Sequence, residues 1–100
     1  MGGMVDIQDK TSTSREAVSE GFLLLRDGTL KVVRAGQTKK GDPVKTSEVA
    51  AIQAVKDTPR IIPFCHPIPL TNVAVELEVL DDRVRCECRV KAHYKTGVEM

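Results

Sequence analysis

Two runs of alternating residues between positions 73 and 90 constrain the fold more than any other feature of this chain. One side of the first run carries Val73, Val75, Leu77 and Val79, and one side of the second carries Val84, Cys86, Cys88 and Val90. A period of two residues is typical of a half-buried strand. The short segment Leu80-Asp81-Asp82 joins the runs as a turn. The sequence therefore predicts an antiparallel hairpin over residues 72–92, with one solvent-exposed face and one face packed on a helix.

A helix is predicted to begin at Asp42-Pro43 and to run to about Asp57. Aspartate can cap the exposed amides of a helix, and proline is tolerated at the first helical position. The residues that follow place apolar side chains on one side of the helix. Thr58-Pro59 is predicted to end it, because proline disfavours helical backbone at the residue before it. A helix packed on an antiparallel hairpin places the chain in the α+β class.

The first third of the chain is less regular. Residues 15–26 hold a dense apolar cluster closed by Asp27-Gly28, which predicts a buried strand followed by a turn. Residues 29–35 fit either a second hairpin strand or a two-turn helix capped by Gly36. Residues 1–14 are polar and are predicted to form a flexible N-terminal arm that orders only against a partner. Residues 15–100 are expected to form a single domain.

Composition excludes several classes of function. The 15 basic and 14 acidic residues nearly balance, which argues against a nucleic-acid binder or a membrane binder driven by charge. The three cysteines are an odd number, and no apolar run is long enough for a signal peptide or a membrane span. These observations predict free thiols and a cytoplasmic location. A domain of 100 residues buries only a modest core, so oligomerisation is a common source of further stability.

A connector rich in proline spans residues 61–70 and displays Cys65 and His66. Pro63, Pro67 and Pro69 each fix their own φ angle and extend the preceding residue, so the connector is predicted to be stiff. One interpretation is a preorganised reactive site. The other is that the prolines end a helix and start a strand, with Cys65 as a small buried hydrophobic residue and His66 as a hydrogen-bonded surface residue.

Two further clusters carry residue types that bind anions or metals. Lys39 and Lys40 stand directly before the predicted helix start, where free amides favour anions, so the turn is either a phosphate site or an ordinary solvated turn. Cys86 and Cys88 have only one residue between them, whereas zinc sites usually place two or more between paired cysteines. A small zinc-binding domain is therefore disfavoured, and no metal site is predicted.

Several motif blocks, in one order, together resemble the cyclic pyranopterin monophosphate synthase family of molybdenum-cofactor biosynthesis, known as MoaC. The blocks are Met4-Val5-Asp6, Thr13 with Arg15-Glu16-Ala17, Lys40-Gly41-Asp42, Ala50 with Ile52 and Lys56, Ile62-Pro63-Phe64-Cys65-His66-Pro67 and Lys95-Thr96-Gly97-Val98-Glu99-Met100. The resemblance favours a helix over residues 29–35. It implies a ferredoxin-like antiparallel sheet packed on helices, assembled as a homohexamer, a trimer of dimers with each active site shared between two subunits.

The resemblance also implies a lyase activity and roles for single residues. The expected reaction converts 3′,8-cyclo-7,8-dihydroguanosine 5′-triphosphate to cyclic pyranopterin monophosphate and pyrophosphate. Arg15 and Lys40 would neutralise phosphates, and His66 would transfer a proton, with Lys40 and Glu99 as further catalytic residues. The residues expected to line the substrate site are Phe64, Cys65, His66, Glu99 and Met100. No resident cofactor is implied, and Mg²⁺ accompanying the triphosphate stays an open alternative.

The chain departs from the family pattern in two ways. Phe64 replaces a commoner leucine, and the sequence stops at Met100, where family members continue into a long helix and a final strand. The sequence is accordingly expected to be the N-terminal two-thirds of a synthase subunit, with that C-terminal helix and strand absent and with little activity alone. The alternative function, from a different class, is a non-catalytic ferredoxin-like module that binds a phosphorylated ligand.

Overall fold

The computed structural model describes residues 3–8, 11–95, 98 and 100, and within them it contains three strands and two helices. In chain order these are β1 (Thr13–Leu24), α1 (Asp27–Ala35), α2 (Pro43–Ile61), β2 (Leu70–Val79) and β3 (Arg83–Tyr94). The central strand β3 is antiparallel to both neighbours in the order β1-β3-β2. Strands β1 and β2 are therefore parallel, with β3 between them, which is the split β-α-β arrangement of ferredoxin-like folds. The predicted α+β class is confirmed.

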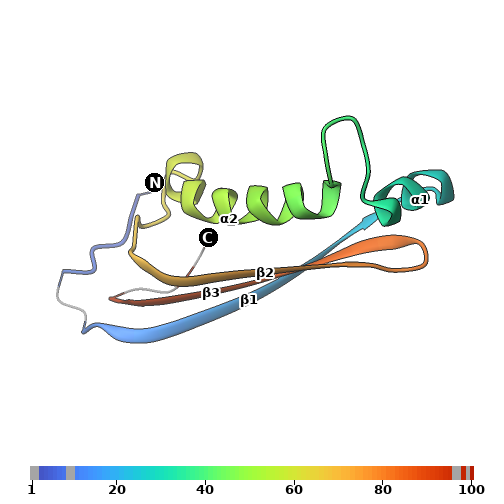
Figure 1. The fold of residues 1–100 in the computed structure, drawn as a ribbon. Coiled ribbons are helices and arrows are strands. Elements are labelled where there is room, and N and C mark those ends of the chain that lie inside the picture. The colour runs from blue at the N-terminus through green and yellow to red at the C-terminus, as the bar shows by residue number, and fades with distance from the viewer. Residues whose placement is uncertain (1–2, 9–10, 96–97, 99) are drawn as a thin grey trace.

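The predicted hairpin is present as β2 and β3. Val73 pairs with Val90 and Leu77 with Cys86, so the apolar residues of both strands share one face of the sheet. In the turn, the Leu80 amide donates a hydrogen bond to the Arg83 carbonyl oxygen at 2.7 Å. Helix α2 runs along this apolar face (Figure 1), and the opposite face carries the charged residues.

Residues 27–35 form helix α1, so the helical alternative for residues 29–35 is confirmed. Gly36 ends the helix with a φ angle of 66°, and its amide donates to the Val33 carbonyl oxygen at 3.1 Å. A left-handed glycine after the last turn is the usual helix end. The turn predicted at Asp27-Gly28 is wrong, because both residues belong to the first helical turn, where an acidic residue is favoured by the helix dipole.

Helix α2 begins where the sequence predicted and ends later. The Asp42 carboxylate caps the helix by accepting a hydrogen bond from the Val44 amide at 3.0 Å. The predicted end near Asp57 is wrong, since the helix continues through Pro59 to Ile61. The Thr58 hydroxyl donates to the Ala54 carbonyl at 2.7 Å, and the Ile62 amide donates to the Thr58 carbonyl at 2.8 Å. Because these bonds continue the last turn, the proline only removes one amide donor there.

The core of the described residues is small. Its buried apolar members are Leu30, Val55, Cys65, Ile68, Val90 and Ala92. Leu30 anchors α1 and is fully buried, whereas Leu23 and Leu24 at the end of β1 are 62% and 64% exposed. The chain is elongated, with extents of 53 × 29 × 23 Å. Much of the apolar surface of β1 is thus not buried by any other element in the described part of the chain.

Candidate functional site

The connector between α2 and β2 folds into two consecutive tight turns. The Cys65 amide donates to the Ile62 carbonyl at 3.1 Å, and Pro63 occupies the second position of that turn, which proline favours. The Ile68 amide then donates to the His66 carbonyl at 2.9 Å, which closes a three-residue turn around Pro67. The prolines therefore do hold Cys65 and His66 on a hydrogen-bonded connector.

The two central residues of the connector differ in exposure. Cys65 is 3% exposed and its thiol lies 3.7 Å from the His66 carbonyl oxygen, so it occupies the core as a small apolar residue. His66 is half-buried, and its Nε2 lies 2.8 Å from the carbonyl oxygen of Val5. Phe64, before them, is 55% exposed. Of these three predicted site residues, only Phe64 and His66 present side chains to solvent.

Arg15 lies at the same end of the sheet as the connector. It pairs with Ala92 on β3, and Ala92 pairs in turn with Leu70, the first residue of β2. The Arg15 side chain is half-buried, and its Nε atom is buried with no hydrogen-bond partner among the described residues. Burying a guanidinium donor without a hydrogen-bond partner costs free energy of folding. This position therefore favours binding of an anionic ligand.

A cavity of about 280 Å³ adjoins the connector, and Met100 forms part of its lining. Its lining comes from the last turns of α2, the connector, the start of β2 and the chain end, as Val55, Lys56, Pro59, Pro67, Ile68, Leu70 and Met100. Met100 therefore lies beside the connector residues Pro67 and Ile68. Lys56 brings an ammonium group that the sequence interpretation had not placed in the site. Glu99 lies outside the described residues.

Lys40 is not brought to this end of the molecule. It lies in an exposed turn in which the Thr38 hydroxyl donates to the Gly41 carbonyl at 2.6 Å and accepts from the Lys40 amide at 3.3 Å. Gly41 has a φ angle of 107°, which favours glycine at this turn. Helix α2, which starts two residues later, has 19 residues and separates this turn from the connector. The structure therefore places His66, Arg15 and Met100 at one end of the sheet and leaves Lys40 beyond the other end of α2.

Comparison with known proteins agrees with the motifs of this site. The MoaC family profile covers residues 4–100. The chain belongs to the MoaC family. A relative from Aeropyrum pernix is 50% identical over 98 residues, covering 98% of this chain and 67% of the relative. A relative from Thermococcus onnurineus is 47% identical, covering 97% of this chain and 62% of the relative. A relative from Methanopyrus kandleri is also 47% identical, covering 97% of this chain and 64% of the relative.

All three relatives carry the printed name "Probable cyclic pyranopterin monophosphate synthase". This MoaC family chain spans about 62% of the length of its Thermococcus onnurineus relative, which is less than two thirds. The connector and the residues around it lie inside the shared region, because the family profile begins at Met4 and reaches Met100.

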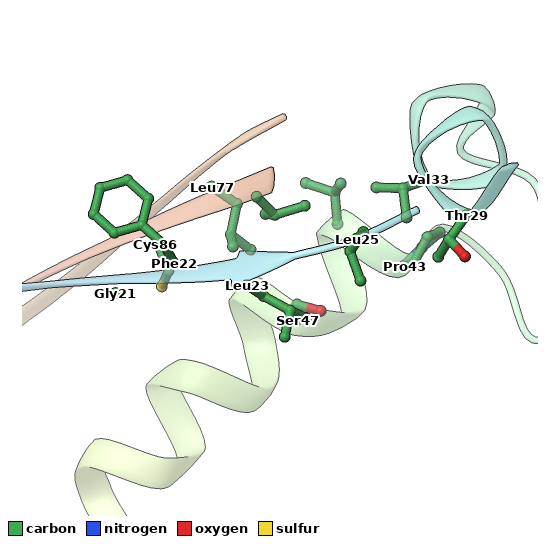
Figure 2. Close-up of a pocket in the computed structure, with 12 residues that line it drawn as sticks. Gly21, Phe22, Leu23, Leu25, Thr29, Val33, Pro43, Ser47, Leu77 and Cys86 are labelled. Atoms are coloured by element: carbon green, nitrogen blue, oxygen red, sulfur yellow. The ribbon is translucent and has the colours of Figure 1, made fainter. Parts of the chain in front are cut away.

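A second, larger cavity of about 530 Å³ lies at the other end of the MoaC family domain (Figure 2). Side chains from the end of β1, from α1 and from the first turns of α2 surround it, and most of them are apolar. Cys86 and Leu77 line its side toward the sheet. The sequence interpretation did not identify this cavity, because its walls come from five separate elements without a shared motif.

The charged face of the sheet is held by ion pairs across its strands. Arg85 donates to Glu20 on β1 and to Glu87 on its own strand, both at 2.6 Å, and Arg89 pairs with Glu16 on β1. The hydrogen bond from Arg85 lowers the pKa of the Glu87 carboxyl, and the same pair raises the pKa of Arg85. Paired charges of this kind fix the register of β1 against β3.

Cys86 and Cys88 are free thiols, as predicted for them. Cys86 and Cys88 lie on the same face of the sheet as Val75 and Leu77, and both are only half-buried. Burial raises the pKa of the Cys88 thiol, and the neighbouring Cys86 adds to the effect. Within the described residues, no group of three or more His, Cys, Asp or Glu side chains could hold a metal ion. Neither described helix is long and apolar enough to cross a bilayer.

Proposed function

We propose that this protein is a cyclic pyranopterin monophosphate synthase of molybdenum-cofactor biosynthesis. It would convert 3′,8-cyclo-7,8-dihydroguanosine 5′-triphosphate to cyclic pyranopterin monophosphate with release of pyrophosphate. Membership of the MoaC family and the printed name of its relatives support the assignment. The observation that carries it in this chain is that the connector with His66, the unpartnered Arg15 donor and the cavity lined by Met100 lie at the same end of the sheet.

The residues at this end can supply what such a reaction requires. A triphosphate carries several negative charges, and the buried Nε donor of Arg15 is suited to one of its phosphate oxygens. Lys56, beside the Met100 cavity, is a second cation within the same subunit. His66 is the candidate for proton transfer, because imidazole can both give and take a proton near neutral pH.

The remaining predicted site residues take narrower roles. Phe64 is exposed beside His66 and offers an apolar ring surface to the substrate base, while the buried Cys65 shapes the connector from beneath. Glu99 is proposed as a catalytic carboxylate next to Met100. Mg²⁺ would travel with the triphosphate as part of the substrate. A cytoplasmic location accords with the free thiols of Cys86 and Cys88.

Lys40 would contribute to the active site of a neighbouring subunit. Because α2 separates it from His66 in one chain, a site that uses both residues needs two chains. We propose that each active site lies between two subunits and that the protein is a homohexamer, a trimer of dimers. The exposed apolar residues of β1, including Leu23 and Leu24, provide surface that such an assembly would cover.

An assay of the intact protein with the cyclic dihydroguanosine triphosphate tests the function. We expect equimolar release of pyrophosphate and of cyclic pyranopterin monophosphate, and a loss of turnover of about 100-fold or more in His66→Ala, since general acid–base groups contribute at least that much. Lys39→Ala is the matched control for Lys40→Ala, because both lysines are exposed in the same turn. Binding of the substrate without turnover would reject the synthase assignment and favour a ligand-binding module.

A further inference from the structure

The N-terminal segment, residues 3–8, meets the connector through a main-chain oxygen. The His66 Nε2 atom lies 2.8 Å from the Val5 carbonyl oxygen, across 61 positions of sequence. A carbonyl oxygen can only accept a hydrogen bond, so Nε2 must carry the proton and donate it. In a neutral imidazole only one nitrogen is protonated, and Nδ1 is then the basic atom of the ring.

A second contact holds the same segment at the residue directly after the end of β3. The Lys95 ammonium group donates to the Gln8 carbonyl oxygen at 3.2 Å. Between the two contacts the Gln8 amide donates to the Asp6 carboxylate at 3.0 Å, which closes a tight turn of the kind that aspartate favours. The segment is thus fixed at Val5 and at Gln8, and its shape between them is set by Asp6.

We propose that residues 5–8 act as a positioning strap on His66. The Val5 carbonyl holds the ring in one orientation with the proton on Nε2, and Nδ1, which is buried from solvent in this structure, is the atom that accepts a proton during the reaction. This inference rests on the proposed function, since it names the reacting atom of His66. Val5 is a positioning residue, because it acts through His66. Fixing the tautomer of a catalytic histidine through its second nitrogen is an established way of orienting the ring.

The test is a nitrogen NMR spectrum of the intact protein labelled at its histidines, compared with two variants. In the native protein we expect a His66 Nε2–H signal protected from exchange with water and ring shifts of the Nε2–H tautomer. Removal of residues 2–6 should abolish the protected signal. Val5→Ala should keep it, because alanine retains the carbonyl and changes only the side chain. A native ring protonated on Nδ1, or a protected signal that survives the deletion, would overturn the proposal.

A third variant covers the case in which the deletion disturbs folding. Replacing the amide between Val5 and Asp6 by an ester keeps every side chain and makes the Val5 carbonyl a weaker acceptor. We expect faster exchange of the Nε2–H proton and a fall in kcat of about five- to tenfold with little change in KM, the effect of one weakened hydrogen bond. An ester variant with native exchange, or with faster exchange and native kcat, would contradict the strap. A native protein without synthase activity would reject the proposed function, while the NMR result would still decide the contact.

Discussion

Lys40 and His66 lie beyond opposite ends of the same helix, three residues before Pro43 and five residues after Ile61. A helix of 19 residues is about 28 Å long. No side chain spans that length, so the two predicted site residues cannot act on one small substrate from the same subunit. This separation connects the proposed chemistry to the proposed assembly, because a site that uses both His66 and Lys40 would require Lys40 from a second chain.

Truncation of Leu30 should destabilise the domain severely. Leu30 is the fully buried side chain of α1, so Leu30→Ala leaves a cavity and should lower the free energy of unfolding by about 3 kcal/mol. Val32→Ala is the matched control, since Val32 lies in the same helix and is 50% exposed. Urea denaturation followed by circular dichroism measures both. Equal midpoints for the two variants would show that Leu30 does not anchor the helix.

The Asp42 cap should contribute measurably to stability. Asp42→Ala removes the hydrogen bond to the Val44 amide and should lower the free energy of unfolding by about 1 kcal/mol. Asp42→Asn can still cap the helix and should lose much less. Thermal unfolding of the three proteins in the same buffer gives the comparison. A loss in the asparagine variant as large as in the alanine variant would contradict capping as the cause.

The local elements could be predicted because their signals are short in range. The alternation of apolar and polar residues predicts the hairpin, and Asp42-Pro43 predicts the start of α2. Each of these signals depends on neighbouring residues alone. The end of α2 could not be predicted in the same way. The restriction before Pro59 is a bias, and the hydrogen bonds of Thr58 with Ala54 and Ile62 outweigh it.

The parts of the candidate site that carry a side-chain motif could be predicted from the sequence. The connector was identified from its own residues and Arg15 from the family resemblance, and the sheet register brings them to one end. The contact between Val5 and His66 was not predicted. The histidine bonds to the main-chain carbonyl of Val5, and because every residue has such a carbonyl, no side-chain motif marks the contact. The separation of Lys40 from His66 follows from the length of α2, and the motif order alone does not show it.

Stability should fall on acidification as the sheet ion pairs are lost. The hydrogen bond from Arg85 lowers the pKa of Glu87 below its ordinary value of 4.5, so Glu87 stabilises the fold above that value. The contribution should disappear as the pH falls from about 4.5 through the lowered pKa of the folded state. Glu87→Gln should flatten the change in urea midpoint between pH 6 and pH 3. A variant with the native pH dependence would exclude Glu87 as a source of the effect.

The thiols should resist alkylation in the folded protein. Burial raises the pKa of Cys88, and Cys65 is 3% exposed, so both should react slowly with iodoacetamide at pH 8. The same protein in urea should react at all three positions. Peptide mass spectrometry over time resolves each cysteine. Fast labelling of Cys65 in the native state would show that the connector opens on the timescale of the reaction.

Subunit complementation tests the shared site most directly. His66→Ala and Lys40→Ala, each expected to be inactive, are co-expressed with two different tags, and the protein that carries both tags is purified. In a mixed dimer, one of the two shared sites receives an intact His66 from one chain and an intact Lys40 from the other.

The measurement is the rate of pyrophosphate release by the doubly tagged protein. The proposal predicts recovery to about a quarter to a half of the native rate per subunit, since at most one of the two symmetric sites in a mixed dimer is complete. A site built within a single chain would leave every subunit defective. No activity above that of the single variants, in a preparation shown to contain both chains, would therefore contradict the account.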